Sequence, residues 1–197
     1  MRELVFFLEE PSAREMLKGL LPRFVDSNIY CRYIVFEGKT DLENNIERKL
    51  RCWNTPQTRF IILRDQDSGD CELIKINLKQ KCAVSGKSET LVRIACHELE
   101  NWYLGDLKAV EKGLDLSNLS KHQNKKKYRN PDNLSNAAEE LKRLKGFRCQ
   151  KVDGSRRIGP FLDLANNTSR SYQVFIHGIR RSLETWNSNE SPSDIRC

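Results

Sequence analysis

The feature that most constrains the fold is an alternation of short apolar runs with longer stretches of helical periodicity. Apolar runs at residues 4–8, 29–36, 59–63 and 91–96 have the length of buried strands. Amphipathic stretches follow the first three runs. Strands that alternate with helices favour a mostly parallel sheet with right-handed crossovers. The N-terminal half is therefore predicted to be α/β, with a four-stranded sheet flanked by helices.

Two of the expected helices carry a capping-box pattern at their start. Ser12 and Glu15 precede the apolar positions of the first, and Thr40 and Glu43 precede those of the second. A third helix is expected over residues 71–82, after a turn. Each crossover in this half therefore contains a helix.

The sequence changes character after residue 105. Helices are expected near residues 107–114, from Asp132 to about 144, and from about 171 to 183, with a polar, basic loop before the second of them. We therefore divide the chain into an α/β domain at residues 1–105, a helical extension packed on it at 106–186, and a polar tail at 187–197.

Composition restricts the class of protein. A chain of 197 residues suits one main core, and none of its apolar runs approaches the roughly 18 to 20 residues that span a bilayer. The seven cysteines form neither a C-x-x-C pair nor a zinc-like group, so reduced thiols and a cytoplasmic location are expected. The net charge of +7 slightly favours a polyanionic partner, although a basic pI is common.

Acidic residues follow three of the expected strands. They are Glu9 and Glu10 after the first, Asp65, Asp67 and Asp70 after the third, and Glu98 and Glu100 after the fourth. The carboxyl ends of parallel strands meet at one edge, and crowded carboxylates repel unless a cation joins them. Mg²⁺ prefers such oxygen ligands. The pattern therefore predicts a magnesium site, with metal ligands among Glu9, Asp65, Asp67, Asp70 and Glu100.

Other interpretations of the acids are open. Any single cluster could simply cap the helix that follows it. The "DQDSGD" segment is not an EF-hand loop, because its glycine comes one place early and Ile76 stands at the twelfth position. A haloacid-dehalogenase-type phosphatase also uses D-x-D, but normally after the first strand.

Two motifs, in their order along the chain, resemble the Toprim domain, the metal-binding α/β fold of topoisomerases, primases and the overcoming-lysogenisation-defect nucleases. "FFLEEPSA" resembles its first-strand glutamate motif and "ILRDQDSGD" its D-x-D motif. With "FEGKTDLE" and "RIACHELENWYLGD", the chain resembles a group of small bacterial Toprim-like proteins, and there the similarity extends to "GSRRIGPFLD" and "NNTSRSYQVF". The Toprim resemblance itself covers about residues 3 to 105.

The resemblance implies a Mg²⁺-dependent nuclease, with Mn²⁺ as an alternative metal, that cuts DNA or RNA. It also implies a separate ABC- or SMC-like ATPase as partner, in bacterial defence against phage. Carried over by position, Glu9 is the first-strand glutamate, and Asp65 and Asp67 are the D-x-D pair. Glu98 or Glu100 is the late acid of a second metal site, so the expected catalytic residues are Glu9, Asp65, Asp67, Glu98 and Glu100.

The sequence departs from the Toprim pattern at two positions. Glu10 stands where glycine usually follows the first glutamate, and Ala13 stands where an acid is often found. These departures put two-metal chemistry in doubt. Glu37 in "VFEGKTD" imitates the first-strand motif, but that alignment would leave a surplus strand before it.

Basic side chains offer contacts for nucleic-acid phosphates. The candidates are Lys125, Lys126, Lys127 and Arg129 around Tyr128, and Lys151, Arg156 and Arg157 further on. The last three could also stabilise a transition state. The alternative for both groups is a solvated loop.

A few polar and aromatic residues near these motifs have plainer interpretations. His97 could act as an acid or base, although a lone histidine is usually structural. Trp102 and Tyr103 are expected in the core, and Ser169 or Ser171 is expected to cap the last helix.

Three functional hypotheses follow. The first is the Mg²⁺-dependent nuclease, the second a non-catalytic Toprim-like module that binds nucleic acid or an ATPase, and the third a D-x-D phosphohydrolase of small esters. The sequence leaves the choice between DNA and RNA, the number of metals, and homo-oligomerisation open.

Overall fold

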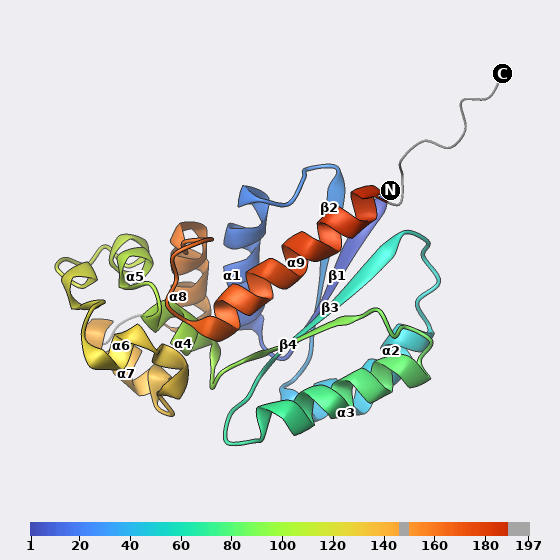
Figure 1. Ribbon diagram of the computed structural model, residues 1–197, viewed down its shortest axis with the longest axis horizontal. Helices are drawn as coiled ribbons and strands as arrows, with labels where there is room; N and C mark the ends of the chain where they lie inside the picture. The colour runs from blue at the N-terminus through green and yellow to red at the C-terminus, as the bar shows by residue number, and fades with distance from the viewer. Residues whose placement is uncertain (146–149, 189–197) are drawn as a thin grey trace.

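The computed structural model describes residues 1–145 and 150–188 and has an α/β architecture, as predicted (Figure 1). Four parallel strands form one sheet in the order β2-β1-β3-β4. The strands are β1 (Arg2–Leu8), β2 (Ile29–Val35), β3 (Thr58–Asp65) and β4 (Leu91–Ala95). Because the strands are parallel, the acidic segments after β1, β3 and β4 leave the sheet at the same edge.

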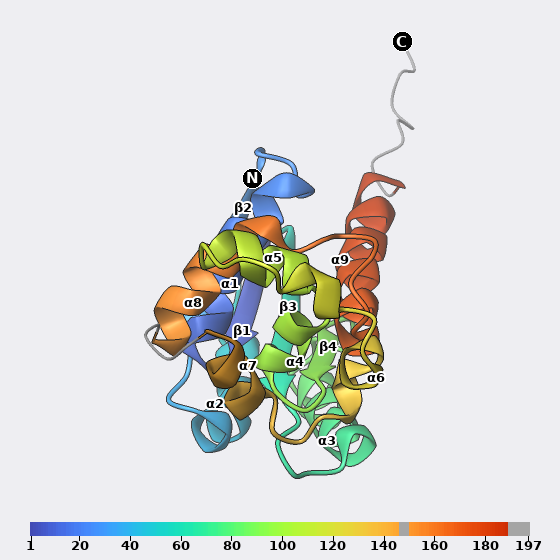
Figure 2. The ribbon, with the colours of Figure 1, turned by 90° about the vertical axis from the view of Figure 1, so that its left-hand side faces the viewer.

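Helices cover both faces of the sheet (Figures 1 and 2). The crossover helices are α1 (Pro11–Leu20), α2 (Lys39–Arg51) and α3 (Cys71–Val84). Alternate residues of β1 point to opposite faces, so Val5 and Phe7 pack with α2 and α3, whereas Phe6 and Leu8 face α1. A fully buried strand of this kind has the continuous apolar sequence "LVFFL".

The C-terminal helices continue the core on the α1 face. They are α4 (Leu99–Leu104), α5 (Leu107–Gly113), α6 (Lys126–Arg129), α7 (Ala137–Lys145), α8 (Lys151–Ile158) and α9 (Arg170–Ser188). Helix α8 packs against α1, and α9 packs along β4. Trp102, expected in the core, is fully buried, and its ring centroid lies 4.9 Å from that of Phe175 on α9.

Short 3₁₀ turns link several of these elements. They are η1 (Leu21–Arg23), η2 (Ser120–His122), η3 (Pro131–Asn133) and η4 (Gly159–Phe161). The turn η4 lies so close to α1 that a Cβ on Gly159 would come within 2.4 Å of the Met16 carbonyl oxygen. This close approach brings the segment that contains α8 up to the first crossover helix.

The predicted capping boxes were wrong. Helix α1 begins after Glu10, and the Ser12 hydroxyl donates to Glu10 Oε2 at 2.9 Å. Helix α2 begins after Gly38, whose φ of 94° favours glycine. Glu15 makes ion pairs instead of a cap. The motif matched residues in the first turn, but the chain enters each helix earlier.

Three other boundaries differ from the prediction. Helix α7 begins at Ala137 because Asp132 is engaged elsewhere: it accepts hydrogen bonds from the Ser169 hydroxyl and the Ser171 amide. The expected basic loop contains η2, α6 and η3. The tail expected from 187 begins later, since α9 extends to Ser188, and residues 189–197 lie outside the described part.

The cap of the last helix was predicted correctly. Ser169 Oγ accepts a hydrogen bond from the Tyr172 amide at 3.2 Å, which is the N-cap arrangement for a helix that begins at Arg170. Within residues 1–145 and 150–188, none of the helices combines the length and the hydrophobicity that crossing a bilayer requires.

The attachment of α9 can be tested with two phenylalanines. Phe175 is a fully buried residue of α9, whereas Phe161 is 46% exposed. Phe175→Ala should lower the free energy of unfolding by about 3 to 5 kcal/mol, because it opens a cavity against Trp102. Phe161→Ala should cost less than about 1 kcal/mol. Urea unfolding followed by tryptophan fluorescence measures both, and equal effects would contradict the packing described.

Candidate active site at the carboxyl edge of the sheet

The first two acids meet directly where β1 and β3 end. Glu9 Oε2 accepts a hydrogen bond from the Asp65 amide at 3.1 Å, and both residues are only 8% exposed. The register of β1 and β3 causes this meeting, because Leu8 pairs with Leu63 and the next residues leave the sheet together. The Glu9 carboxylate and the Asp65 backbone are therefore neighbours in the fold.

Lys151 brings a cation from the helical extension into the same cluster. Its Nζ lies 2.6 Å from Glu10 Oε2 and 3.6 Å from Glu100 Oε1. Lys151 is the first residue of α8, which packs on α1, so the contact between these helices fixes the ammonium beside the acids. We call Glu9, Glu10, Asp65, Glu100 and Lys151 the acidic cluster.

Burial and repulsion from neighbouring acids act on three carboxylates of the acidic cluster. Burial raises the pKa of Glu9, Asp65 and Glu100, most strongly for Asp65, whose pKa lies well above its ordinary value. Lys151 opposes the rise at Asp65 and Glu100. Burial also opposes the charge of Lys151, but Glu100 and Glu10 outweigh it, and the pKa of Lys151 is raised.

Asp67 lies beside this cluster but is engaged by other partners. Its carboxylate accepts from Lys39 Nζ at 2.8 Å, and its φ of 55° is a left-handed conformation that aspartate tolerates better than most residues. The Asp67 amide donates to the His97 carbonyl oxygen at 2.9 Å, and His97 Nδ1 lies 3.0 Å from the Asp67 carbonyl oxygen. His97 therefore braces the loop that carries Asp67.

Asp70 and Glu98, two of the predicted site residues, have structural partners. Asp70 Oδ1 accepts from the Glu72 and Leu73 amides at 2.8 and 3.0 Å, so Asp70 is the N-cap of α3. Glu98 Oε2 accepts from the Ala138 amide at 3.2 Å and thereby contacts α7. Glu98 is also the N-cap of α4, where it forms a capping box with Asn101. The helix-cap alternative thus describes Asp70 and Glu98, and it does not describe Asp65.

The basic residues predicted to contact nucleic acid differ in whether an acidic side chain already pairs with them. Lys127 pairs with Glu140 at 2.5 Å, and Arg156 pairs with Glu15 at 3.0 Å. Arg157 is exposed on α8, close to α5, and its carbonyl carbon and oxygen are among the atoms nearest to Gly113. The remaining basic candidates, Lys125, Lys126 and Arg129, are exposed on and beside α6. The segment around Lys151, which the sequence left open as a solvated loop, is helix α8.

Two cations at the site were missed by the sequence analysis. Arg64 is 6% exposed, its Nη1 donates to the Asp65 carbonyl oxygen at 2.6 Å, and its charge lowers the pKa of Glu9. Its Nε lies 3.0 Å from Glu43 Oε1. Lys39 stands in the "FEGKTD" segment that imitates a glutamate motif. The sequence feature that could have identified Arg64 is its position, as a basic residue, next to the apolar run of the strand.

The sequence analysis also missed a pair of cysteines beside the site. Cys71 Sγ and Cys96 Sγ lie 3.7 Å apart, and both thiols are free. They come from the start of α3 and from the end of β4, which are 25 positions apart in the sequence. No spacing rule for cysteines finds such a pair.

The donors of the acidic cluster suit a hard divalent cation. Glu100 Oε2 is buried without a hydrogen-bond partner, and Glu9 and Asp65 supply further carboxylate oxygens. Among the described residues, however, no three His, Cys, Asp or Glu side chains already stand in a metal-holding arrangement. The Lys151 ammonium supplies the positive charge among these carboxylates. If the cluster took a cation, the carboxylates available to hold it would be those of Glu9, Asp65 and Glu100, with Glu10 beside them.

Comparison with known proteins gave one match. A family model with the description "Domain of unknown function (DUF4276)" matches residues 8–180. This range includes the end of β1, the rest of the sheet, α8 and most of α9. Searches of curated proteins and of solved structures found no significant match.

The crowding of carboxylates predicts that Asp65→Asn stabilises the protein in EDTA. A carboxyl whose pKa is raised by folding binds its proton more tightly in the folded state, so its contribution to stability falls as pH rises from the ordinary pKa through the folded one. The asparagine side chain carries no charge, so it avoids the cost of burying a carboxylate. The free energy of unfolding at neutral pH should therefore rise by on the order of 1 kcal/mol.

Urea unfolding at pH 5 and pH 8 measures this gain, which should be larger at pH 8. Asp26→Asn is the matched control, since Asp26 is exposed. A loss of stability at pH 8 in Asp65→Asn would refute the electrostatic account.

Lys151→Gln should have the opposite effect. The change leaves the buried Glu100 and Asp65 without their shared cation, and because the Lys151 side chain is 40% exposed the cost should be about 1 to 2 kcal/mol at pH 8. The cost should shrink towards pH 5 as the carboxyls become protonated. Lys126→Gln, at an exposed position, controls for loss of charge. A cost independent of pH would speak against Lys151 as the counter-ion.

Proposed function

The chain belongs to the family described as Domain of unknown function (DUF4276), and we propose its activity from the chemistry of the acidic cluster. The proposal is a Mg²⁺-dependent nuclease that hydrolyses phosphodiester bonds. The observation that supports it is the grouping of three buried acids: the Glu9 carboxylate accepts from the Asp65 backbone amide at 3.1 Å, and Glu100, whose Oε2 has no hydrogen-bond partner, is close enough to raise the pKa of Asp65. The Toprim resemblance of these same segments supports it.

Each group of the cluster would have a distinct task. Glu9, Asp65 and Glu100 would bind the divalent cation, which supplies an activated water and stabilises the leaving oxygen. If Glu9 is not a ligand of the cation, it could instead accept the proton of the attacking water.

Lys151 and Arg64 would handle the charge of the phosphate. Both are cations held in place by neighbouring groups, and fixed cations stabilise charge that develops in a transition state. Lys151 is already paired with Glu10 and Glu100, so a phosphate would share it with these acids. Arg156 pairs with Glu15, which lies outside the acidic cluster, whereas Lys151 contacts two acids of the cluster and is the better candidate of the two.

Two extensions of the proposal rest on the resemblance. A separate ABC- or SMC-like ATPase would control the nuclease, and the pair would act against phage. DNA and RNA are both retained as substrates, because chemistry directed at phosphate does not distinguish them.

One observation favours the non-catalytic alternative. Lys151 balances the acids internally, so a folded site does not require a metal. In that case the module would only bind nucleic acid or an ATPase. The two functions predict different results in a cleavage assay.

Two aspartates that lie close together in the sequence provide the variants for that assay. Asp65→Asn should reduce Mg²⁺- or Mn²⁺-dependent cleavage of plasmid and RNA by about 100-fold or more, because it removes a ligand. Asp70→Asn should retain activity within a few-fold, since asparagine caps a helix as well as aspartate does. Gel analysis with an EDTA control measures both.

Three outcomes would count against the nuclease. If wild type and Asp65→Asn are equally inert, the non-catalytic module replaces it. If Asp70→Asn is as inactive as Asp65→Asn while folded, the assignment of Asp70 as a cap alone is wrong. Release of phosphate from p-nitrophenyl phosphate, with polynucleotides left intact, would identify a phosphohydrolase.

A further inference from the structure

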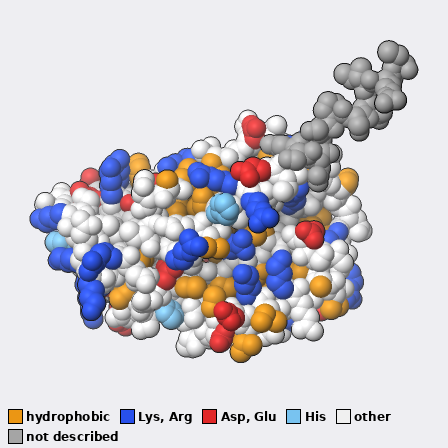
Figure 3. Space-filling model, in the orientation of Figure 1, with side chains coloured by type: hydrophobic (Ala, Val, Ile, Leu, Met, Phe, Trp, Pro, Cys, Tyr) orange, Lys and Arg blue, Asp and Glu red, His pale blue; other side chains and the backbone are white. Residues whose placement is uncertain are grey.

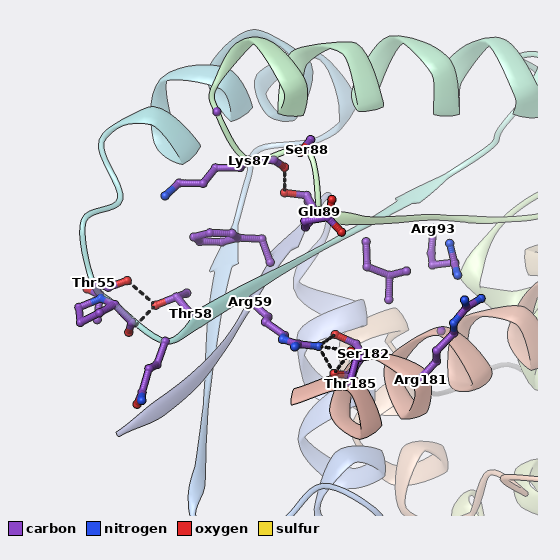
Figure 4. Close-up of a pocket in the computed structure, with 17 residues that line it drawn as sticks. Thr55, Thr58, Arg59, Lys87, Ser88, Glu89, Arg93, Arg181, Ser182 and Thr185 are labelled. Atoms are coloured by element: carbon purple, nitrogen blue, oxygen red, sulfur yellow. Dashed lines mark hydrogen bonds between the residues drawn. The ribbon is translucent and has the colours of Figure 1, made fainter. Parts of the chain in front are cut away.

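A second candidate site lies at the opposite edge of the sheet. A cavity of about 860 Å³ opens where β3 and β4 begin, between the turn that precedes β4 and the C-terminal half of α9 (Figure 4). Strands β3 and β4 separate it from the acidic cluster. A volume of this size is typical of small-ligand sites.

The cavity wall carries an excess of positive charge. Its basic residues are Arg59, Lys87, Arg93 and Arg181. Glu89 is the single acid among the lining residues, all of which belong to the described part of the chain. In the space-filling view, Lys and Arg side chains also gather along α9 and in the band between α9 and α3 (Figure 3). This charge favours an anionic ligand.

Arg93 is the group that most needs an anion. Its guanidinium is partly buried and bonds to the backbone carbonyl oxygens of Val92 and Val174 at 2.9 and 3.2 Å. Burial lowers its pKa. No carboxylate pairs with it among the residues that the structure describes. A desolvated cation held only by carbonyl groups is a ready partner for a phosphate.

Helix α9 is shaped to place Arg93 beside a second arginine. A Cβ at Gly178 would lie 2.6 Å from Arg93 Nη2, so only glycine leaves room for the guanidinium against α9. Arg181 stands three residues later, on the same side of the helix, and extends toward Arg93 in Figure 4. Both arginines line the cavity, so an anion bound there could contact the two guanidinium groups together.

The other two cations define the extent of the site. Arg59 Nη1 donates to the Ser182 carbonyl oxygen and, at 2.7 Å, to Thr185 Oγ1, so it ties α9 to β3 and forms the floor. Lys87 lies apart from the arginines, with its ammonium 5.6 Å from the Phe60 ring centroid. The cavity thus offers one strong cationic position at Arg93 and Arg181 and a second at Lys87.

We propose that this cavity binds a phosphate group of its ligand at Arg93 and Arg181. The phosphate belongs either to a free nucleotide or to the backbone of a nucleic-acid strand. The proposal is independent of the nuclease proposal, because its residues belong to the opposite edge of the sheet.

The test compares two neighbouring arginines of α9. Arg181 lines the cavity, whereas Arg180 lies 5.7 Å from the Phe24 ring centroid and does not line it. Arg181→Glu and Arg180→Glu change the net charge equally. Pyrophosphate and ADP are titrated by calorimetry, and a short fluorescein-labelled single strand by anisotropy, at low salt with EDTA, so that the acidic cluster needs no metal.

We expect Arg181→Glu to weaken binding at least about tenfold and Arg180→Glu to change it less than about twofold. Gly178→Ala, which displaces Arg93, should weaken binding as well. Circular dichroism melts show that each variant is folded, and Arg181 is exposed, so its replacement leaves the core intact.

Each outcome decides the proposal. Binding of pyrophosphate and ADP that depends on Arg181 supports the nucleotide as the source. Binding of the labelled strand alone, again dependent on Arg181, supports the nucleic-acid backbone. Absence of binding by all probes, or equal losses in Arg181→Glu and Arg180→Glu, overturns the proposal. Because EDTA is present throughout, a failed nuclease assay leaves this test unaffected.

Discussion

The contact between Lys151 and the buried acids is the interaction on which the site depends. Burying Glu9, Asp65 and Glu100 at one edge costs free energy because each carboxylate loses water and repels the others. Lys151 supplies compensating charge, and it can do so only because α8 is docked on α1. The helical extension is therefore part of the site. The family match, which runs through both regions, agrees with this interdependence.

The sequence predicted the sheet well because the fold is encoded locally there. Each strand is a continuous apolar run, and each crossover has helical periodicity. The parallel direction of the strands therefore follows from general rules for strand–helix–strand connections. The meeting of Glu9 and Asp65 follows in turn, since both residues stand where paired strands end. Capping was predicted poorly: Ser12 and Thr40 fit a motif, yet tertiary contacts made Glu10 and Gly38 the actual caps.

The rest of the site could not be read from local patterns. Lys151 is more than fifty positions from Glu100, and only the packing of α8 brings them together. Asp70 looked like a ligand because it follows Asp65 and Asp67, but the geometry of the turn aims it at the amides of α3. Cys71 and Cys96 are neighbours because β3 and β4 are adjacent in the sheet. Arg93 and Gly178 are neighbours because α9 packs on β4. Spacing along the chain predicts neither pair.

The two edges of the sheet carry charges of opposite sign, so one attracts a polyanion and the other repels it. The net charge of +7 attracts it from a distance, and basic side chains on α9 extend that attraction over one face. Complementarity with the helix dipole does not explain this charge, because the last turn of α9 contains no basic residue. At the other edge, carboxylates alone would repel a phosphate. Lys151 and Arg64 reduce that repulsion, so the approach of a phosphodiester is electrostatically acceptable only while both cations stay in place.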